Sequence, residues 1–559
     1  KIIHININYL YIYMKYIVIT GGVISGLGKG ITAASIGAIL KGAGYKTTMI
    51  KIDPYINVDA GTMSPFEHGE VFVLNDGSET DLDLGNYERF LNINLTGDHN
   101  ITTGKVYKSV IDDERKGKYL GQTVQIIPHI TNRIQELIVN AAYAPIDKNK
   151  IAPEICIIEV GGTIGDIESM PFIEAIRQLN YNNNPNEMCF IHVSLVPTIG
   201  RDGESKTKPT QNSVKDLRQL GLFPDIMIVR SETEIDVKTR DKISMFSQVP
   251  ENNIISNPNV NSIYDVTVNF DMQNIGDIIC NKLDLIFNKK PAYLINIKDY
   301  TSLYLPYNDD KVDNITIGIV GKYTTFTDSY LSVVRALEHA GYYNKCKINI
   351  KWLSSENINL TDIDNCNGII IPGGFGNRGI NGMLLVAKFC REKNIPILGI
   401  CLGMHIMCIE AARQIYGFSC NSEEFEPDAK HPIISIVNED NKNMGGTMKL
   451  GLHKTYITKS NNDCLTTAYK CYSENDCENK KDVEYICERH RHRYEVNPKY
   501  REDLSSKLFF SGKDTEEKCI DIVEITNHKF YIGCQYHPEF QSYLHKPSPL
   551  FNGLVKTCL

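Results

Sequence analysis

The sequence has little tryptophan, no long apolar run and no paired cysteines. It contains 1 Trp among 559 residues, and no uninterrupted apolar stretch reaches the roughly 18 residues that a membrane-spanning helix needs. The 16 Cys are scattered, without a C-x-x-C pair or the spacing of a small disulfide framework. This distribution is typical of a reducing compartment, so we expect a cytoplasmic protein without a membrane segment.

Excess positive charge is also missing. The net charge of -8 argues against a general nucleic-acid or membrane-surface binder, although local lysines and backbone amides can still hold a triphosphate. Hydrophobic residues make up 42% and charged residues 23%, as in ordinary globular proteins. Residues 1–13 are apolar but lack the small-residue cleavage site of a signal peptide, and we interpret them as an extension before Met14.

Apolar runs alternate with helical segments in two successive series, which predicts mainly parallel sheets covered by helices. The length likewise favours at least two domains. We predict an α/β protein of two tandem domains, 14–287 and 314–559, joined by an aperiodic linker over 288–313. The polar segments 182–186 and 459–481 are predicted surface loops. The expected strands are 16–20, 47–52, 155–160, 189–196, 226–229, 315–320, 369–372 and 397–400, with helices over 29–41 and 328–340.

A glycine-rich turn, GGVISGLGKG at 21–30, follows the first predicted strand. Glycines let successive backbone amides point at one anion, and the helix that follows adds its dipole. Lys29 then reaches the terminal phosphates of a nucleotide. The spacing departs from G-x-x-x-x-G-K-[ST], because Gly30 replaces the metal-binding hydroxyl. A turn that binds no ligand is the alternative.

The missing hydroxyl predicts that carboxylates hold the metal, as is common for Mg²⁺. Asp83 follows an extended segment, and Glu159 ends the apolar run ICIIE directly before a Gly-Gly pair. Ligands bind at the carboxyl ends of parallel strands, where Glu159 is expected. A solvated acidic loop for Asp83 and a helix-capping role for Glu159 are the alternatives.

The segment Lys206–Gln211, KTKPTQ, offers two Lys, two Thr and a Gln around a turn fixed by Pro209. These groups suit a triphosphate and a polar base, and Lys51 at the end of the second strand is placed to reach the same cleft. A charged surface turn is the alternative, which composition alone favours.

The second series contains a nucleophile turn. Cys401, in ILGICLG, lies between a predicted strand and a helix, flanked by the small residues that a strained turn requires. The helix N-terminus favours a thiolate there, and the PGGFG turn after another strand offers amides for an oxyanion. Downstream, YHPEF supplies His537 as a base and Glu539 to orient it. The elements predict a Cys-His-Glu triad that hydrolyses an amide.

The run Arg489–Arg493, RHRHR, has the composition of a nucleic-acid patch and the spacing of a His-x-His metal site. Glutamates flank it and no other ligand cluster accompanies it. Neither interpretation is favoured.

The chain resembles the CTP synthases over nearly its whole length after residue 14. The motifs that carry the resemblance are GGVISGLGKG, KIDPYINVDAGTMSPFEHGEVFVLNDGSETDLDLG, YLGQTVQIIPHIT, EVGGTIGDIES, KTKPTQ, PGGFG, GICLGM, ERHRHRYEVN and QYHPEF. The resemblance implies a P-loop-like parallel-sheet synthetase domain followed by a class I glutamine amidotransferase α/β domain. It also implies a glutamine-dependent ligase that makes CTP from UTP and ATP in pyrimidine nucleotide biosynthesis.

The family's functional residues are carried over where this sequence matches. ATP is expected at Gly26, Leu27, Gly28, Lys29, Gly30, Ile31 and Asp83, with Mg²⁺ on Asp83 and Glu159. UTP or CTP is expected at Ser25, Lys51, Asp166, Ile167, Glu168, Lys206, Thr207, Lys208, Pro209, Thr210, Gln211 and Lys242. Glutamine is expected at Gly374, Leu402, Gly403, Met404, His405, Glu424 and Arg493, beside the catalytic Cys401, His537 and Glu539.

The resemblance further implies GTP as an allosteric activator, CTP as a feedback inhibitor, and a homotetramer built from dimers that is able to form filaments. Two features depart from the family. His405 stands where the pattern usually has Gln, which puts its contact with glutamine in doubt, and the 459–481 segment is longer than usual.

The implied reaction phosphorylates the uracil 4-oxygen with ATP and displaces the phosphate with ammonia from glutamine. Because free ammonia is mostly protonated and diffuses away, a sheltered route between the sites is expected, although no residue pattern traces it. A cobyrinate-type diamide synthase is one alternative, opposed by KTKPTQ and KIDPYINVD. A filament-building protein with relic enzyme sites is another, opposed by the triad and the metal pair.

Overall fold

The computed structural model describes residues 14–146, 151–199, 204–287, 312–436, 448–461, 464–474, 484–515 and 518–559. The predicted extension 1–13 and nearly all of the predicted linker lie outside these ranges. The chain divides into two compact units, residues 1–59 with 86–301, and residues 60–85 with 302–559. The predicted domain boundaries stay predictions; they differ from this division in the segment 60–85, which packs with the second unit. Every helix in the described ranges is too short or too polar to cross a bilayer.

The first unit is built on a parallel sheet with the order β11-β10-β7-β1-β6-β2-β5. Every ladder between these strands is parallel, and Ile19 on β1 pairs with Glu159 on β6. The strands are β1 (Lys15–Gly21), β2 (Thr47–Asp53), β5 (Asn100–Thr102), β6 (Ile155–Val160), β7 (Met188–Leu195), β10 (Ile226–Arg230) and β11 (Ile254–Asn257). β6 is buried along its whole length, as expected of a strand covered on both faces.

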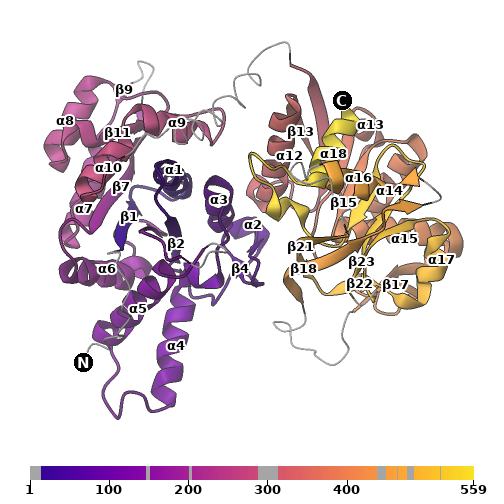
Figure 1. The fold of residues 1–559 in the computed structure, drawn as a ribbon, viewed down its shortest axis with the longest axis horizontal. Helices are drawn as coiled ribbons and strands as arrows, with labels where there is room; N and C mark the ends of the chain where they lie inside the picture. The colour runs from indigo at the N-terminus through magenta and orange to yellow at the C-terminus, as the bar shows by residue number, and fades with distance from the viewer. Residues whose placement is uncertain are drawn as a thin grey trace. The chain divides into compact units, whose positions relative to one another are not determined.

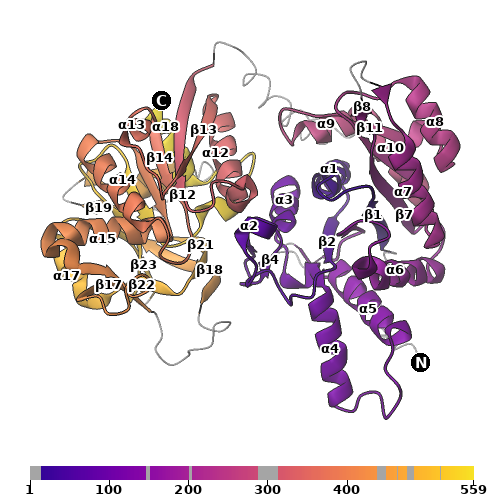
Figure 2. The same ribbon diagram turned by 180° about the vertical axis from the view of Figure 1, so that it is seen from behind.

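Helices cover both faces of this sheet (Figure 1 and Figure 2). On one face, α4, α5 and α6 pack against Val18, Ile50 and Ile158. On the other, Gly37 of α1 lies close to Ile157, and α1 contacts α9 and α10. The helices are α1 (Lys29–Gly42), α3 (Leu82–Leu91), α4 (Thr103–Arg115), α5 (Thr131–Ala142), α6 (Met170–Asn182), α7 (Lys208–Gln219), α8 (Val237–Ser247), α9 (Asp265–Met272) and α10 (Ile275–Leu283).

The second unit contains a mixed sheet with the order β13-β12-β14-β15-β25-β24-β23-β18-β21. The ladders from β13 to β25 are parallel, as predicted, whereas those from β25 to β21 are antiparallel, which the sequence did not indicate. The strands are β12 (Asn314–Gly321), β13 (Lys347–Ser354), β14 (Gly368–Ile371), β15 (Ile397–Ile400), β18 (Lys449–Ile457), β21 (Tyr485–His492), β23 (Phe509–Asp514), β24 (Ile520–Glu524) and β25 (Tyr531–Cys534).

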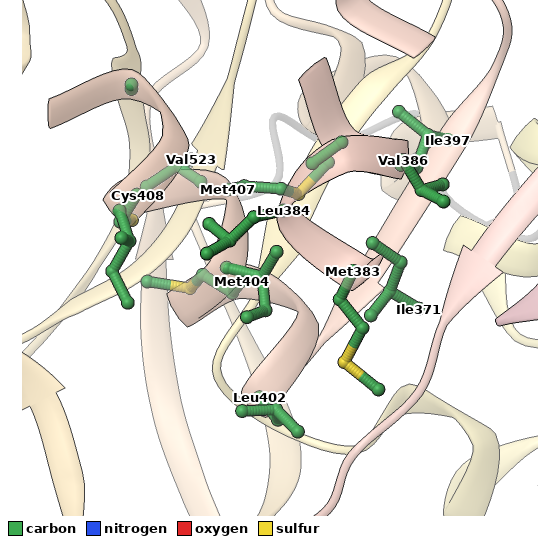
Figure 3. Close-up of a cluster of buried hydrophobic side chains, with 14 of the residues drawn as sticks. Ile371, Met383, Leu384, Val386, Ile397, Leu402, Met404, Met407, Cys408 and Val523 are labelled. Atoms are coloured by element: carbon green, nitrogen blue, oxygen red, sulfur yellow. The ribbon is translucent and has the colours of Figure 1, made fainter. Parts of the chain in front are cut away.

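Alternate residues of the central strands enter two cores. Ile371 and Ile397 pack with α14 and α15 in the core shown in Figure 3, whereas Ile370 and Leu398 pack with α12 and α18 on the opposite face. The main helices are α12 (Leu331–Asn344), α13 (Leu360–Asp364), α14 (Ile380–Lys393), α15 (Leu402–Tyr416), α16 (Thr467–Glu474), α17 (Arg501–Ser505) and α18 (Pro549–Cys558). A smaller sheet is formed by β16 (Cys420–Ser422), β17 (His431–Ile436) and β22 (Tyr494–Val496).

Two local predictions need correction. The predicted loop 459–481, of which 462–463 and 475–481 lie outside the described residues, contains α16. Ala468 and Tyr472 of this helix are buried in the core beneath α18, so the helical spacing of its apolar residues outweighs its polar composition. The predicted helix 328–340 begins only at Leu331, after a tight turn over Thr327–Tyr330.

The segment 60–85 packs within the second unit through α2 (Pro65–His68), β3 (Phe72–Val73) and β4 (Glu79–Thr80). The Ser332 amide donates to Glu70 Oε2 over 3.0 Å, and Ser329 Oγ donates to the Pro65 carbonyl over 2.8 Å. These contacts attach residues 60–85 to the start of α12, beside the cavity described next.

Candidate active sites

The turn between β15 and α15 holds Cys401 in a conformation that few residues adopt. Cys401 has φ 50° and ψ -99°, and it is largely buried. The glycines around it are required by close packing: a β-carbon on Gly403 would lie 2.1 Å from the Ile371 carbonyl oxygen, and one on Gly399 would lie 2.7 Å from Gly403. The strained turn therefore presents the thiol at the N-terminus of α15, as the sequence predicted.

His537 and Glu539 follow β25 and form the second part of this site. His537 Nδ1 lies 2.7 Å from Glu539 Oε1, and the His537 amide donates to the Arg489 carbonyl over 2.8 Å. The Phe540 ring stacks on the imidazole with 5.0 Å between ring centroids. Burial lowers the pKa of His537, but the Glu539 carboxylate and Cys401 outweigh it and raise the pKa to about 10. The imidazole is thus held in one orientation and favoured in its cationic form.

Cys401, His537 and Glu539 line one cavity together with the PGGFG turn. Its walls are formed by Pro65, Glu70, Val71, Tyr323, Ser329, Tyr330, Val333, Pro372, Gly373, Gly374, Phe375, Arg491 and Phe540. A β-carbon on Gly373 would lie 2.7 Å from His537 Cε1, so only glycine allows the turn to come this close to the imidazole. The predicted triad and the predicted oxyanion turn therefore meet in one place.

The predicted glutamine-binding residues fall into two groups. Gly374 lines the cavity, and Glu424 accepts a 2.7 Å hydrogen bond from the Gly376 amide. Burial raises the pKa of Glu424, against the smaller opposing effects of that hydrogen bond and of the charges on Lys322 and Arg493. By contrast, Leu402, Met404 and His405 are buried in α15, and the Leu402 and Met404 side chains pack in the core of Figure 3.

Three residues at this site were missed by the sequence reasoning. Lys322 Nζ donates to the carbonyls of Phe375 and Gly376, and burial lowers its pKa to about 8. Gln535 Nε2 donates to Cys401 Sγ over 3.8 Å, and the Arg491 carbonyl lies 3.8 Å from the same sulfur. Gln535 lies in the quoted QYHPEF motif, so its place two residues before His537 was the available signal.

In the first unit, the predicted phosphate loop joins β1 to α1. Gly26 and Gly28 have φ of +73° and +83°, which allows the left-handed turn that precedes the helix. Lys29 folds back over Gly21, and its Nζ donates to the Gly162 carbonyl. The loop has the glycine conformations and the lysine that the anion-site prediction requires, although Lys29 is engaged by the chain itself.

Glu159, at the end of β6, is buried beside Lys51. Lys51 Nζ lies 3.1 Å from Glu159 Oε1, and Tyr87 Oη donates to Glu159 Oε2. Each carboxylate oxygen of Glu159 has a second lone pair, so Glu159 can bind a metal ion while it keeps these hydrogen bonds. Asp83 lies in the first turn of α3 and belongs to the other compact unit, so its pairing with Glu159 stays a prediction. Within the described residues no group of three or more His, Cys, Asp or Glu is arranged around a metal position, but Mg²⁺ commonly needs only one or two carboxylates.

The KTKPTQ segment is a helix start and not only a turn. Lys208 begins α7, and Lys208 and Gln211 line an open hollow with Lys215 and Arg218. The hydrogen bond from Lys206 and the charge of Lys242 lower the pKa of Glu204, which places these two predicted lysines near each other. The predicted base contacts lie in and beside a tight turn, where Asp166 accepts from the Thr163 amide and the side chains of Ile167 and Glu168 are exposed.

The first four residues of the RHRHR run form the end of β21, and Arg493 follows the strand. Arg489 is buried and donates to Asn75 Oδ1, Arg491 donates to Glu79 Oε1, and His490 hydrogen-bonds His492. These residues are engaged inside the second unit, which agrees with neither a nucleic-acid patch nor a metal site.

The strained cysteine turn, the His-Glu pair and the adjoining glycine turn define a cysteine-dependent amidotransferase domain, and a second α/β unit with a glycine-rich strand-to-helix loop accompanies it. Residues 15–285 match the family model "CTP synthase N-terminus", and residues 325–557 match "Glutamine amidotransferase class-I". The chain belongs to the CTP synthase family.

Relatives in this family match along nearly the whole chain. CTP synthase 1-A of Xenopus laevis is 47% identical over 97% of this chain and 92% of its own length. CTP synthase 1 of Homo sapiens is 46% identical over 97% and 92%. CTP synthase of Methanococcus maripaludis is 46% identical over 98% and 100%. A solved glutaminase domain of Trypanosoma brucei CTPS with bound acivicin is 34% identical and covers 44% of this chain and 93% of its own, with a TM-score of 0.39. The predicted fold class and the predicted glutamine-dependent ligase are confirmed.

Proposed function

We propose that this protein aminates UTP to CTP at the cost of ATP, with nitrogen released from glutamine at Cys401. The observation that carries the proposal is the cavity of the second unit, where Cys401, His537 and Glu539 meet in a chain of the CTP synthase family. UTP, ATP and glutamine are the substrates, and the product enters pyrimidine nucleotide metabolism.

Glutamine hydrolysis follows from the geometry at Cys401. The thiolate attacks the amide carbon of glutamine, and the oxyanion faces the amides of the Pro372–Phe375 turn. Protonated His537 gives its proton to the departing ammonia. It then takes a proton from the water that hydrolyses the thioester, which yields glutamate and the free thiol. Glu539 keeps the imidazole aligned through its 2.7 Å contact with Nδ1.

The first unit is proposed to consume this ammonia. Amides of the 21–30 loop and Lys29 hold the ATP phosphates, while Lys51 and the Lys206–Gln211 segment hold UTP. The γ-phosphoryl group passes to the uracil 4-oxygen, ammonia adds at the neighbouring ring carbon, and phosphate leaves to give CTP. Asp83 and Glu159 would hold Mg²⁺, which neutralises charge on the phosphate oxygens when bound.

Regulation and assembly complete the proposal. We assign GTP as an allosteric activator and CTP as a feedback inhibitor at a site that overlaps the UTP site. The assembly is a cytoplasmic homotetramer of dimers that is able to form filaments. These assignments rest on the family resemblance.

The proposal is tested by following CTP absorbance with UTP, ATP and Mg²⁺, using either glutamine or an ammonium salt as nitrogen donor. Cys401→Ser should abolish the glutamine-dependent reaction and keep the ammonium-dependent one, whereas Cys487→Ser, at an exposed cysteine, should keep both. Loss of both activities in Cys401→Ser would refute the division of labour. Absence of turnover in the unmodified protein would instead favour a protein whose enzyme sites are relics.

A further inference from the structure

His405 lies one turn into α15, directly behind the nucleophile. Its side chain is buried, and its Nε2 lies 2.9 Å from Gln535 Oε1. An amide oxygen only accepts hydrogen bonds, so in this arrangement the His405 proton must be on Nε2. The cavity at Cys401 is lined by other residues of the described ranges, which separates His405 from the pocket that glutamine would enter.

Gln535 connects His405 to the reactive sulfur. Its side chain is fully buried, its backbone amide donates to the Asp521 carbonyl over 2.9 Å, and its Nε2 donates to Cys401 Sγ over 3.8 Å. The Arg491 carbonyl, also 3.8 Å from the sulfur, is an acceptor and cannot stabilise a thiolate. A flipped Gln535 amide would present its oxygen to the sulfur, so the orientation of this amide decides whether the thiolate is stabilised or repelled.

We propose that His405 is a positioning residue: by donating to Gln535 Oε1, it fixes the amide so that its NH₂ group faces Cys401 Sγ. The proposal rests on the proposed role of Cys401 as nucleophile. It gives a physical role to the histidine that departs from the family pattern, acting behind the nucleophile and not on glutamine.

The protonation state of His405 suits this role. Burial lowers its pKa to about 4, against the hydrogen bonds with Gln535 and the Tyr494 backbone, so the imidazole stays neutral near physiological pH. A neutral imidazole carries a single proton, and the bond to Gln535 Oε1 requires that proton on Nε2. Cys401 interacts electrostatically with Cys534 and His537 on the facing strand and turn, and neither residue is changed in the variants below.

The test uses two variants of similar polarity and different reach. In His405→Gln the side-chain NH₂ reaches the position of Nε2, whereas in His405→Asn it falls short of Gln535. The full-length proteins are treated with iodoacetamide from pH 5 to 10, and the alkylation rate of the Cys401 peptide is followed by mass spectrometry. We expect the Asn variant to shift the pH midpoint of alkylation upward by about one unit, and the Gln variant to keep the original midpoint.

Kinetics give the second readout. At pH 7 the Asn variant should lose about tenfold in glutamine-dependent kcat/KM, in line with its smaller thiolate fraction, while ammonium-dependent CTP formation stays unchanged. Gln535→Glu, which places a carboxylate beside the sulfur, should shift the midpoint at least as far. Equal midpoints for the Asn, Gln and original proteins would overturn the proposal. Failure of iodoacetamide to modify Cys401 in the original protein would instead refute Cys401 as the nucleophile.

Discussion

Arg491 and Glu79 lie 412 positions apart in the sequence and form a largely shielded ion pair, with 2.8 Å between Arg491 Nε and Glu79 Oε1. The same guanidinium lies 5.1 Å from the centre of the Phe375 ring, and the Arg491 carbonyl faces Cys401 Sγ. A contact from the 60–85 segment therefore helps to fix the backbone beside the nucleophile.

Glu79→Gln should loosen this anchor without changing side-chain size. We expect glutamine-dependent kcat/KM to fall about three- to tenfold, because a shielded charge loses its partner next to the site. Asp362→Asn is the matched control, since it breaks an exposed pair in which Lys351 Nζ and Asp362 Oδ1 are 2.7 Å apart. Equal activities of the two variants would show that the Arg491 anchor does not matter for catalysis.

Local patterns predicted the nucleophile turn. Gly399, Cys401 and Gly403 lie close together in the sequence at the end of a predicted strand, and this spacing alone requires a tight turn. His537 and Glu539 were also predictable, because they lie two residues apart in one motif. The contacts of His405 with Gln535, and of Arg491 with Glu79, join distant segments. They depend on how strands order themselves in the sheet, which local periodicity does not encode.

The antiparallel half of the second sheet was missed for a related reason. β18 and β21 carry polar and charged residues such as Lys454 and Glu488 among their apolar ones, so neither resembles a buried parallel strand. Their register, with His453 opposite Glu488, is set by pairing across the sheet. The phosphate loop, in contrast, was predicted because its glycines and Lys29 lie in one short stretch.

Gly403→Ala should damage the nucleophile turn itself. The new methyl group would lie 2.1 Å from the Ile371 carbonyl oxygen, and backbone cannot move aside as a flexible side chain can. Overpacking of this kind costs about 1–3 kcal/mol, so we expect the melting temperature of the second unit to drop by about 5 °C or more, with loss of glutaminase activity.

Gln414→Ala is the control for that variant, because Gln414 lies on the exposed face of the same helix. Gln414→Ala should change the free energy of unfolding by no more than about 0.5 kcal/mol. A Gly403→Ala protein that melts and turns over like the control would mean that the turn has more space than the packing indicates.

Lys29→Ala should stop CTP formation and keep glutamine hydrolysis, whereas Cys401→Ser should stop glutamine hydrolysis and keep CTP formation from ammonium. We expect CTP formation to fall about 100-fold or more with either nitrogen donor, because the lysine positions phosphate charge in both cases. Glutamate release measured without nucleotides should change less than about twofold. Lys41→Ala, at the other end of α1, also removes hydrogen bonds to backbone carbonyls, those of Leu91 and Asn92, and should leave CTP formation largely intact. Retained synthesis in Lys29→Ala would refute the phosphate-loop assignment.

The His537–Glu539 pair predicts how stability changes with pH. The pKa of His537 is raised from its usual 6.5 to about 10 in the folded protein, because Glu539 and Cys401 outweigh the effect of burial. A raised folded-state pKa means that the stabilisation is fully present below about pH 6.5 and is lost as the pH rises through about 10. Glu539→Gln removes the charge and keeps the shape, so its deficit in melting temperature should be largest near pH 6, at least about 3 °C, and should shrink toward pH 10. Glu426→Gln, at an exposed carboxylate that accepts a hydrogen bond from Asn421, should show a small difference that does not vary with pH. A Glu539→Gln deficit that is the same at pH 6 and pH 10 would mean that His537 is neutral in the folded protein, and the proton for departing ammonia would then have to come from another group.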